Sequence, residues 1–125
     1  MNKQPYVMVM VSDMKRSVRF YKELLGLKLR SESSEWTEFE TGDATIALHG
    51  GGVKRKVAKG PSKTSDLAGT CSLGFVVDNL DRVFQELKSK GVTFAMPPRE
   101  REGEGIKLAV CLDPDGLPIS LSQHN

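Results

Sequence analysis

The hydrophobic and polar positions of the chain follow the same order twice. Residues 6–12 carry valines at every second position and end at a turn residue, which predicts a β-strand. The next segment places apolar residues at the 3.6-residue spacing of a one-sided helix, at Met14, Val18, Tyr21 and Leu25. Three further strands are predicted at 27–31, 35–41 and 44–49. The first half therefore has the order β-α-β-β-β.

The second half repeats this order, including the residues that bound the helix. Asp13 is placed to cap the start of the first helix and Gly26 to end it. When Asp13 is aligned with Asn79, a single gap brings Gly26 onto Gly91. The elements predicted after residue 69 are a strand at 70–77, a helix at 80–90, a strand at 92–95, a loop at 96–105, and strands at 106–112 and 117–123.

The repeat predicts an α+β fold of two tandem βαβββ modules. The modules occupy residues 1–50 and 70–125, and a Gly-, Lys- and Ser-rich linker spans 50–69. A chain of 125 residues has the length of one domain, so we expect 1–125 to fold as a single unit. Each helix should pack on one face of its sheet, which leaves the other face free to curve around a cleft.

Composition and charge argue against several classes of function. A net charge of +2 is too small to indicate nucleic-acid binding, and no apolar run is long enough to span a membrane. The N-terminus has no signal-peptide core. Cys71 and Cys111 lie in unrelated contexts and are expected to be reduced thiols, which favours a cytoplasmic location.

An ordered series of motifs resembles a known family. The series consists of residues 11–27, Trp36 to Phe39, Ile46 to His49, residues 76–92 and residues 112–121. It is similar to the vicinal oxygen chelate superfamily, which includes glyoxalase I, bleomycin-resistance proteins and extradiol dioxygenases. This resemblance implies paired βαβββ modules that form a cleft, commonly in a homodimer. A fold does not define a function, so the site residues have to be considered one by one.

The resemblance also implies four metal-ligand positions, and their residue types do not suit a metal. Metal-dependent members carry His or Gln in the first strand of each module and a carboxylate in the closing strand. In this chain the corresponding residues are Tyr6, Ala47, Ser72 and Ser120. An alanine has no donor atom, and neutral hydroxyls are poor substitutes for imidazole and carboxylate. We therefore expect neither a metal nor another cofactor.

Strand alternation places further candidates on the cleft side. Ile46 and Leu48 are bulky and should face the helix, so Thr45, Ala47 and His49 share the opposite face, as Ser120 does in the second module. His49 is open to three interpretations, namely a rim residue with a local hydrogen bond, a ligand-contacting donor or a metal ligand.

Three other side chains have two interpretations each, and two have a single expectation. Trp36 either stacks on a ligand or packs in the core, and Tyr6 either offers its hydroxyl to a ligand or packs on its neighbours. Arg101 lies in a mixed-charge loop, where it is either solvated or closes over an anionic group. Cys111 is expected to be a buried thiol rather than a nucleophile. His124 is expected to be frayed or exposed.

These observations favour a metal-independent protein that binds or sequesters an unknown small molecule in the cleft. One alternative is a metal-dependent lyase or dioxygenase with displaced ligands. Another is a non-catalytic protein whose surface binds a partner. The expected assembly is a homodimer with no nucleic-acid or membrane partner.

Overall fold

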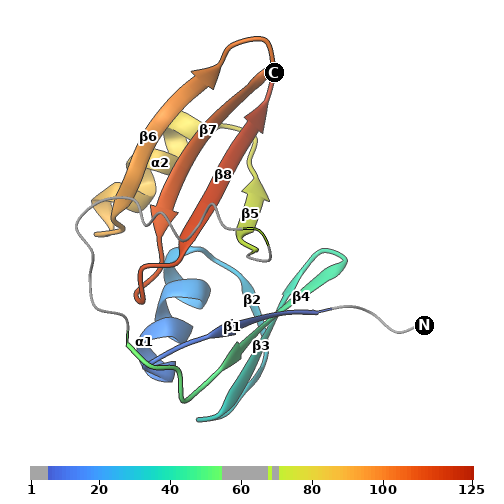
Figure 1. The fold of residues 1–125 in the computed structure, drawn as a ribbon, viewed down its shortest axis with the longest axis vertical. Coiled ribbons are helices and arrows are strands. Elements are labelled where there is room, and N and C mark those ends of the chain that lie inside the picture. The colour runs from blue at the N-terminus through green and yellow to red at the C-terminus, as the bar shows by residue number, and fades with distance from the viewer. Residues whose placement is uncertain (1–5, 55–67, 69–70) are drawn as a thin grey trace. The chain divides into compact units, whose positions relative to one another are not determined.

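The computed structural model describes residues 6–54, 68 and 71–125, and the chain divides into two compact units, Met1–Arg55 and Lys56–Asn125 (Figure 1). The boundary lies within the predicted linker, most of which falls outside the described residues. Each unit is one module and is described by itself. The expectation that 1–125 forms a single domain stays a prediction.

The first module contains one mixed sheet and one helical segment. Its elements are β1 (Tyr6–Met10), α1 (Met14–Arg19), the π-helical turn η1 (Phe20–Leu24), β2 (Lys28–Glu32), β3 (Trp36–Thr41) and β4 (Ala44–His49). The strand order is β1-β4-β3-β2, in which β1 runs parallel to β4 and the other pairs are antiparallel.

The second module repeats that topology. Its elements are β5 (Leu73–Val76), α2 (Leu80–Ser89), β6 (Phe94–Arg101), β7 (Ile106–Leu112) and β8 (Pro118–His124). The strand order is β5-β8-β7-β6, again with one parallel pair, β5 with β8. The predicted α+β fold of two βαβββ modules is confirmed.

The predicted helix caps are confirmed in both modules. Asp13 and Asn79 have extended backbones, and their side-chain oxygens accept hydrogen bonds from the amides of Arg16 and Arg82, each at 3.1 Å. Gly26 and Gly91 adopt positive φ angles of 77° and 90°, which only glycine adopts without strain. The same local chemistry therefore bounds both helices.

The first helix differs from the single α-helix predicted over 14–25. After Arg19 the chain widens into η1, where the amide of Leu25 donates to the carbonyl of Phe20 at 2.9 Å, five residues back. Phe20 and Tyr21 are both buried, with their rings edge to face at 5.1 Å. The wider turn accompanies two consecutive aromatic side chains in the core, which the spacing of an α-helix did not anticipate.

The loop predicted at 96–105 is largely wrong. Strand β6 continues to Arg101, and the pairing with β7 shifts register between Phe94 and Met96 and again between Met96 and Arg99. Pro97 and Pro98 lie in the second irregularity. A strand tolerates proline at an edge or a bulge, and β6 is the edge of its sheet.

The two other corrections concern strand ends. Strand β8 runs through His124, which pairs with Ile106, so His124 is exposed as expected but is not frayed. The strand predicted from residue 70 begins at Leu73 as β5, and residue 70 itself lies outside the described part of the chain.

Each sheet buries one face against its helix, as α2 shows on the second sheet (Figure 1). In the first module the alternating residues of the helix-side face are buried, among them Val9, Phe39, Ile46 and Leu48. In the second module the corresponding buried residues are Leu73, Ala109, Cys111, Ile119 and Leu121. The opposite, helix-free face of each sheet is the part of the fold available for function.

Candidate functional site

Cross-strand register arranges the helix-free face of the first sheet into three rows. Paired residues point to the same side of a sheet, and every second residue of a strand shares that side. The rows, each running from β1 through β4 to β3, are Tyr6, Thr45 and Glu40; Met8, Ala47 and Glu38; and Met10, His49 and Trp36. The predicted alternation of Thr45, Ala47 and His49 against Ile46 and Leu48 is confirmed.

Trp36 joins the two outer rows through its aromatic ring. The indole lies edge to face with the Tyr6 ring, at 5.7 Å between centroids and 83° between planes. It makes a similar contact with the His49 imidazole, at 5.9 Å and 86°. Perpendicular arrangements of this kind are the favoured geometry of aromatic pairs. Three of the sequence-predicted site residues therefore form one cluster. Phe39, on the opposite face of β3, is buried in the core.

Ala47 lies in the middle row and is fully buried, although its side of the sheet carries no helix. The indole of Trp36 spans this row, since it contacts the side chains of the rows on either side and its Nε1 donates to Oε2 of Glu38 at 2.7 Å. The place where the family resemblance implied a carboxylate thus carries a methyl group and is closed to solvent.

Glu38 and Arg30 form the polar border of this face. The Nε and Nη2 atoms of Arg30 both donate to Oε1 of Glu38, at 3.0 and 2.7 Å, and Nη2 also donates to the buried Thr45 hydroxyl at 2.9 Å. The hydrogen bond from Trp36 and then that from Arg30 hold the pKa of Glu38 below its usual value. Glu40 adds longer ion pairs, to Arg30 at 3.9 Å and to Lys28 at 3.7 Å. The carboxylates of this border are therefore matched by cations.

One ring nitrogen of His49 is held by a local contact. Its Nδ1 lies 2.6 Å from the carbonyl oxygen of Gly50. Since a carbonyl oxygen only accepts, Nδ1 donates in this contact, and in the neutral imidazole the lone pair lies on Nε2. The ring is exposed at the end of β4. Of the three interpretations of His49, the local hydrogen bond is present, and it leaves the second nitrogen as an acceptor.

Cross-strand register places serines, aliphatic side chains and, on β6, Arg99 and Arg101 on the helix-free face of the second sheet. Ser120 pairs with Gly74 and Val110, and Ser122 pairs with Val76 and Leu108. Ser120 is half-buried between the buried residues Ile119 and Leu121, which confirms its predicted alternation.

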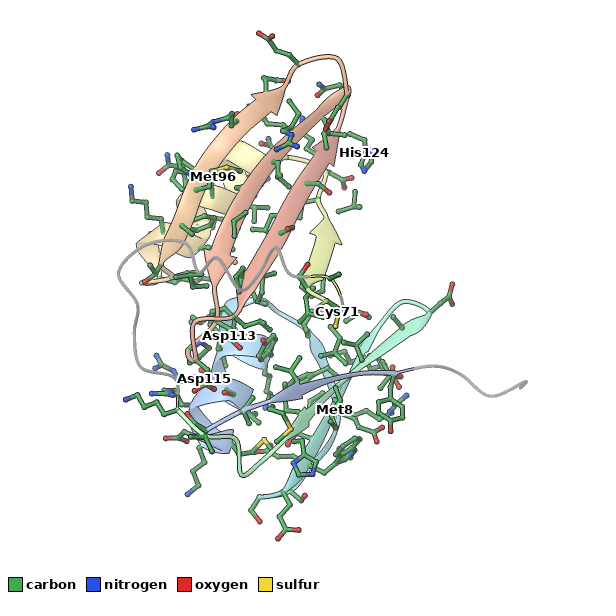
Figure 2. All side chains as sticks on the ribbon, viewed as in Figure 1. Met8, Cys71, Met96, Asp113, Asp115 and His124 are labelled. Carbon is green, nitrogen blue, oxygen red and sulfur yellow. The ribbon has the colours of Figure 1, made fainter. Side chains whose placement is uncertain are left out.

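The two other candidates of the second module lie outside the cross-strand row that contains Ser120. Ser72 is exposed just before β5, and Arg101 ends β6, where its Nε lies 3.4 Å from Oε2 of Glu104. Figure 2 labels Asp113 and Asp115 in the turn after β7, where Oδ1 of Asp113 accepts from the amides of residues 115 and 117. The Asp113 carboxylate therefore has a structural role in the turn.

Sequence reasoning missed four residues of the first face, namely Met8, Met10, Arg30 and Glu38. Met8 and Met10 are 46% and 48% exposed, and Figure 2 labels Met8 on β1. The sequence pattern could have identified them, because both lie an even number of residues from Tyr6 on one strand and so share its face. The roles of the seven predicted ligand-contacting residues stay predictions.

Within residues 6–54, 68 and 71–125, no three His, Cys, Asp or Glu side chains come together as a metal site would need. Cys111 is fully buried, and desolvation raises its thiol pKa to about 11, so the side chain is a protonated core residue at neutral pH. Cys71 is an exposed free thiol. No helix in the described residues has the length and apolar character needed to cross a bilayer.

Two tandem βαβββ modules, each with one helix-free sheet face, define the class of this protein as a paired-module α+β protein. A model of the Glyoxalase/Bleomycin resistance protein/Dioxygenase superfamily matches residues 3–121, and the chain belongs to that superfamily.

Three relatives illustrate the range of the family. The chain is 29% identical over 118 residues to the uncharacterized protein YraH of Bacillus subtilis, covering 87% of this chain and 88% of that protein. It is 26% identical over 122 residues to the virulence protein STM3117 of Salmonella typhimurium, covering 95% and 82%. The crystal structure of STM3117 superimposes with a TM-score of 0.72 at 25% identity, covering all of this chain and 98% of that one.

The third relative is the lactoylglutathione lyase of Schizosaccharomyces pombe, 29% identical over 141 residues. The alignment covers 93% of this chain but only 45% of the lyase.

Proposed function

We propose that this protein binds or sequesters a small, flat, uncharged organic molecule against the helix-free face of its first module, and that binding needs no divalent metal ion. The observation that carries the proposal is the cluster of Tyr6, Trp36 and His49 on an open sheet face. Aromatic side chains supply large contact areas with few rotatable bonds, which suits recognition of a flat ligand.

The charge balance of the face supports an uncharged ligand. Lys28 and Arg30 face Glu38 and Glu40, so the two positive charges offset the two negative ones. Glu38 is already engaged by two donors. A strongly cationic or anionic ligand would have to break these pairs, whereas an apolar ring needs only the exposed aromatic and methionine surface.

The residue types at the four family ligand positions support metal independence. Tyr6, Ala47, Ser72 and Ser120 offer a phenol, a methyl group and two hydroxyls, which are not the ligands that Zn²⁺ or a similar ion prefers. The buried state of Ala47 adds to this, since a carboxylate there would have to fit into a position that is closed to solvent. The cleft expected between the modules stays a prediction from the sequence.

A metal-dependent lyase is the second candidate, because the chain resembles lactoylglutathione lyase over 93% of its length. That candidate requires ligands other than those the family uses. It predicts stoichiometric metal in the purified protein and activity that chelation abolishes.

The exposed edge strands support assembly into a homodimer. They also support the alternative that the protein binds a different partner protein through its surface. Strands β1 and β5 each form an edge, and both carry exposed apolar residues, with Val76 69% exposed. An open edge of this kind is a template for pairing with another chain. Light scattering after gel filtration measures the mass, and a monomer would contradict the dimer. A cytoplasmic location is part of the same proposal.

The central test is a thermal-shift titration with neutral flat heteroaromatic compounds, in buffer with and without EDTA. A ligand selective for the folded state raises the Tm by mass action. We expect the shift to persist in EDTA, to disappear in Tyr6→Ala and Trp36→Leu, and to survive in Tyr6→Phe, which keeps the ring. A shift that EDTA abolishes and Zn²⁺ restores would establish the metal-dependent alternative instead. Native mass spectrometry of the fresh protein reports any retained ligand or metal.

A further inference from the structure

Two exposed methionines and one histidine lie together on the helix-free face of the first sheet. Met8 and Met10 are separated by one residue on β1, so their side chains project from the same side about 7 Å apart. His49 pairs with Met10 on the neighbouring strand, about 5 Å away across the sheet. The register therefore places the three side chains next to one another on one face of the sheet.

Each of these residues offers a neutral, soft or borderline donor. The thioether sulfurs of Met8 and Met10 belong to side chains that are about half exposed, at 46% and 48%. The Nδ1 proton of His49 is held by the Gly50 carbonyl at 2.6 Å, which leaves the Nε2 lone pair for a ligand. A hydrogen bond from the second ring nitrogen to a carbonyl is the usual support of a metal-binding histidine.

We propose that Met8, Met10 and His49 form a binding site for a soft univalent cation, Cu⁺. Thioether ligands select Cu⁺ over the harder divalent ions, and imidazole suits copper as well. The site does not use the family's four ligand positions. It shares His49 and the sheet face with the proposed organic ligand, and it differs in requiring the sulfur atoms of Met8 and Met10.

Trp36 makes the site measurable and adds to its environment. It is the chain's single tryptophan, and its indole lies 5.9 Å from the His49 ring. An indole close to a bound cation contributes a cation–π attraction, and its emission responds to the bound ion. The indole N–H is fixed on Glu38 at 2.7 Å, so the reporter has one defined position.

The competing explanation is that Met8 and Met10 are only apolar surface for an organic ligand, since methionine adapts well to such a role. Leucine separates the two explanations. Met8→Leu and Met10→Leu keep the apolar volume and the fold but remove the sulfur. Met96→Leu, in the second module, is the matched control, and His124→Gln is the control for His49→Gln.

The experiment is a titration of the full chain with Ag⁺, an air-stable soft univalent probe, in chloride-free buffer. Cys71→Ser serves as the parent protein, because the exposed thiol of Cys71 would itself bind Ag⁺, while Cys111 is buried. Trp36 fluorescence gives the affinity, native mass spectrometry gives the stoichiometry, and methionine methyl resonances identify the ligands. Cu⁺ under anaerobic conditions is then tested as a competitor.

We expect one Ag⁺ per chain, with shifts confined to the methyl groups of Met8 and Met10. Removal of a residue that merely supports a metal ligand typically lowers the affinity roughly 10- to 100-fold. The double variant Met8→Leu with Met10→Leu should lower the Ag⁺ affinity at least as much, and so should the single variant His49→Gln. Met96→Leu and His124→Gln should leave the affinity unchanged. Absence of binding, or binding that the double leucine variant retains, would overturn the proposal. Loss of Ag⁺ binding in that variant with an intact thermal shift by organic compounds would leave the proposed function standing.

Discussion

The indole N–H of Trp36 donates to Oε2 of Glu38 at 2.7 Å, two residues further along the same strand. Residues at this spacing share one face of a strand, so the bond lies along the surface of the sheet. The other carboxylate oxygen, Oε1, accepts from Arg30. Glu38 therefore holds Trp36 across the middle row and ties it to the polar border of the site.

Replacement of Glu38 by Gln tests this arrangement. The side-chain amide of glutamine has one oxygen that accepts and an NH₂ group that donates. Either Trp36 or Arg30 would therefore have its N–H directed at the NH₂ group instead of at an oxygen. We expect a loss of about 1–2 kcal/mol in the free energy of unfolding, measured by urea denaturation, because hydrogen bonds to a charged group are lost. Glu40→Gln should cost less than about 1 kcal/mol, since its ion pairs are longer and exposed. Equal effects of the two variants would argue against a special role for Glu38.

The hydrogen bond between Trp36 and Glu38 also predicts that the stability of the fold depends on pH. The pKa of Glu38 is lowered in the folded protein from the ordinary value of 4.5, chiefly by the bond from Trp36. A carboxyl with a depressed folded pKa stabilises the fold above its unfolded pKa and loses that contribution as the pH falls through the folded pKa. The difference in unfolding free energy between wild type and Glu38→Gln should therefore be constant well above pH 4.5 and shrink as the pH falls through that value and below it. A difference that stays constant in acid would show that Glu38 acts through packing alone.

The fold was predictable because its signals are local and occur twice. Asp13 and Asn79 cap as their types indicate, and the alternation around Ala47 and Ser120 gave the correct face. The course of β6 was not predictable, because two prolines ordinarily exclude a strand, and only the register shifts at an edge accommodate them.

Prediction of the site had a different limit. Alternation assigned His49 and Ala47 to one face, but the side-chain direction of Trp36 depends on Glu38 and on ring contacts with two other strands. Such contacts follow from cross-strand register, which the sequence alone does not specify. Met8 and Met10 were missed for a simpler reason, since alternating apolar residues on a strand indicate packing and carry no signal for a donor role.

Two glycines that lack positive φ angles give a matched test of backbone packing. A Cβ added at Gly52 would lie 2.9 Å from the carbonyl oxygen of Val11, whereas one at Gly74 would meet nothing closer than 3.7 Å. We expect Gly52→Ala to lower the unfolding free energy by about 1–3 kcal/mol, because the crowded atom is backbone and cannot rotate away. Gly74→Ala should be neutral or slightly stabilising, since alanine restricts the unfolded chain. Urea denaturation of both variants measures the contrast, and a neutral Gly52→Ala would mean that the segment shifts freely.

The two thiols should differ sharply in reactivity. Cys71 is exposed, while Cys111 is buried with its pKa raised to about 11 by desolvation. Because the thiolate is the reactive form, a disulfide reagent such as DTNB at pH 8 should label one thiol per native chain rapidly and the second only in denaturant. Cys71→Ser should abolish the fast phase. Rapid labelling of Cys111 in that variant would show that the core of the second module opens readily.

Ser17 carries the remaining prediction, because its hydroxyl is buried without a hydrogen-bond partner in the part of the chain that the structure describes. The residue lies within α1, where alanine has the higher helix propensity. Removal of an unsatisfied buried polar group recovers its desolvation cost, so Ser17→Ala should raise the unfolding free energy by about 1 kcal/mol or more. Ser89→Ala is the contrasting control, since that hydroxyl is exposed and donates to the carbonyl of Glu86 at 2.7 Å. It should be neutral or mildly destabilising. A destabilised Ser17→Ala variant in thermal or urea unfolding would indicate that the hydroxyl has a partner in solution, such as a buried water.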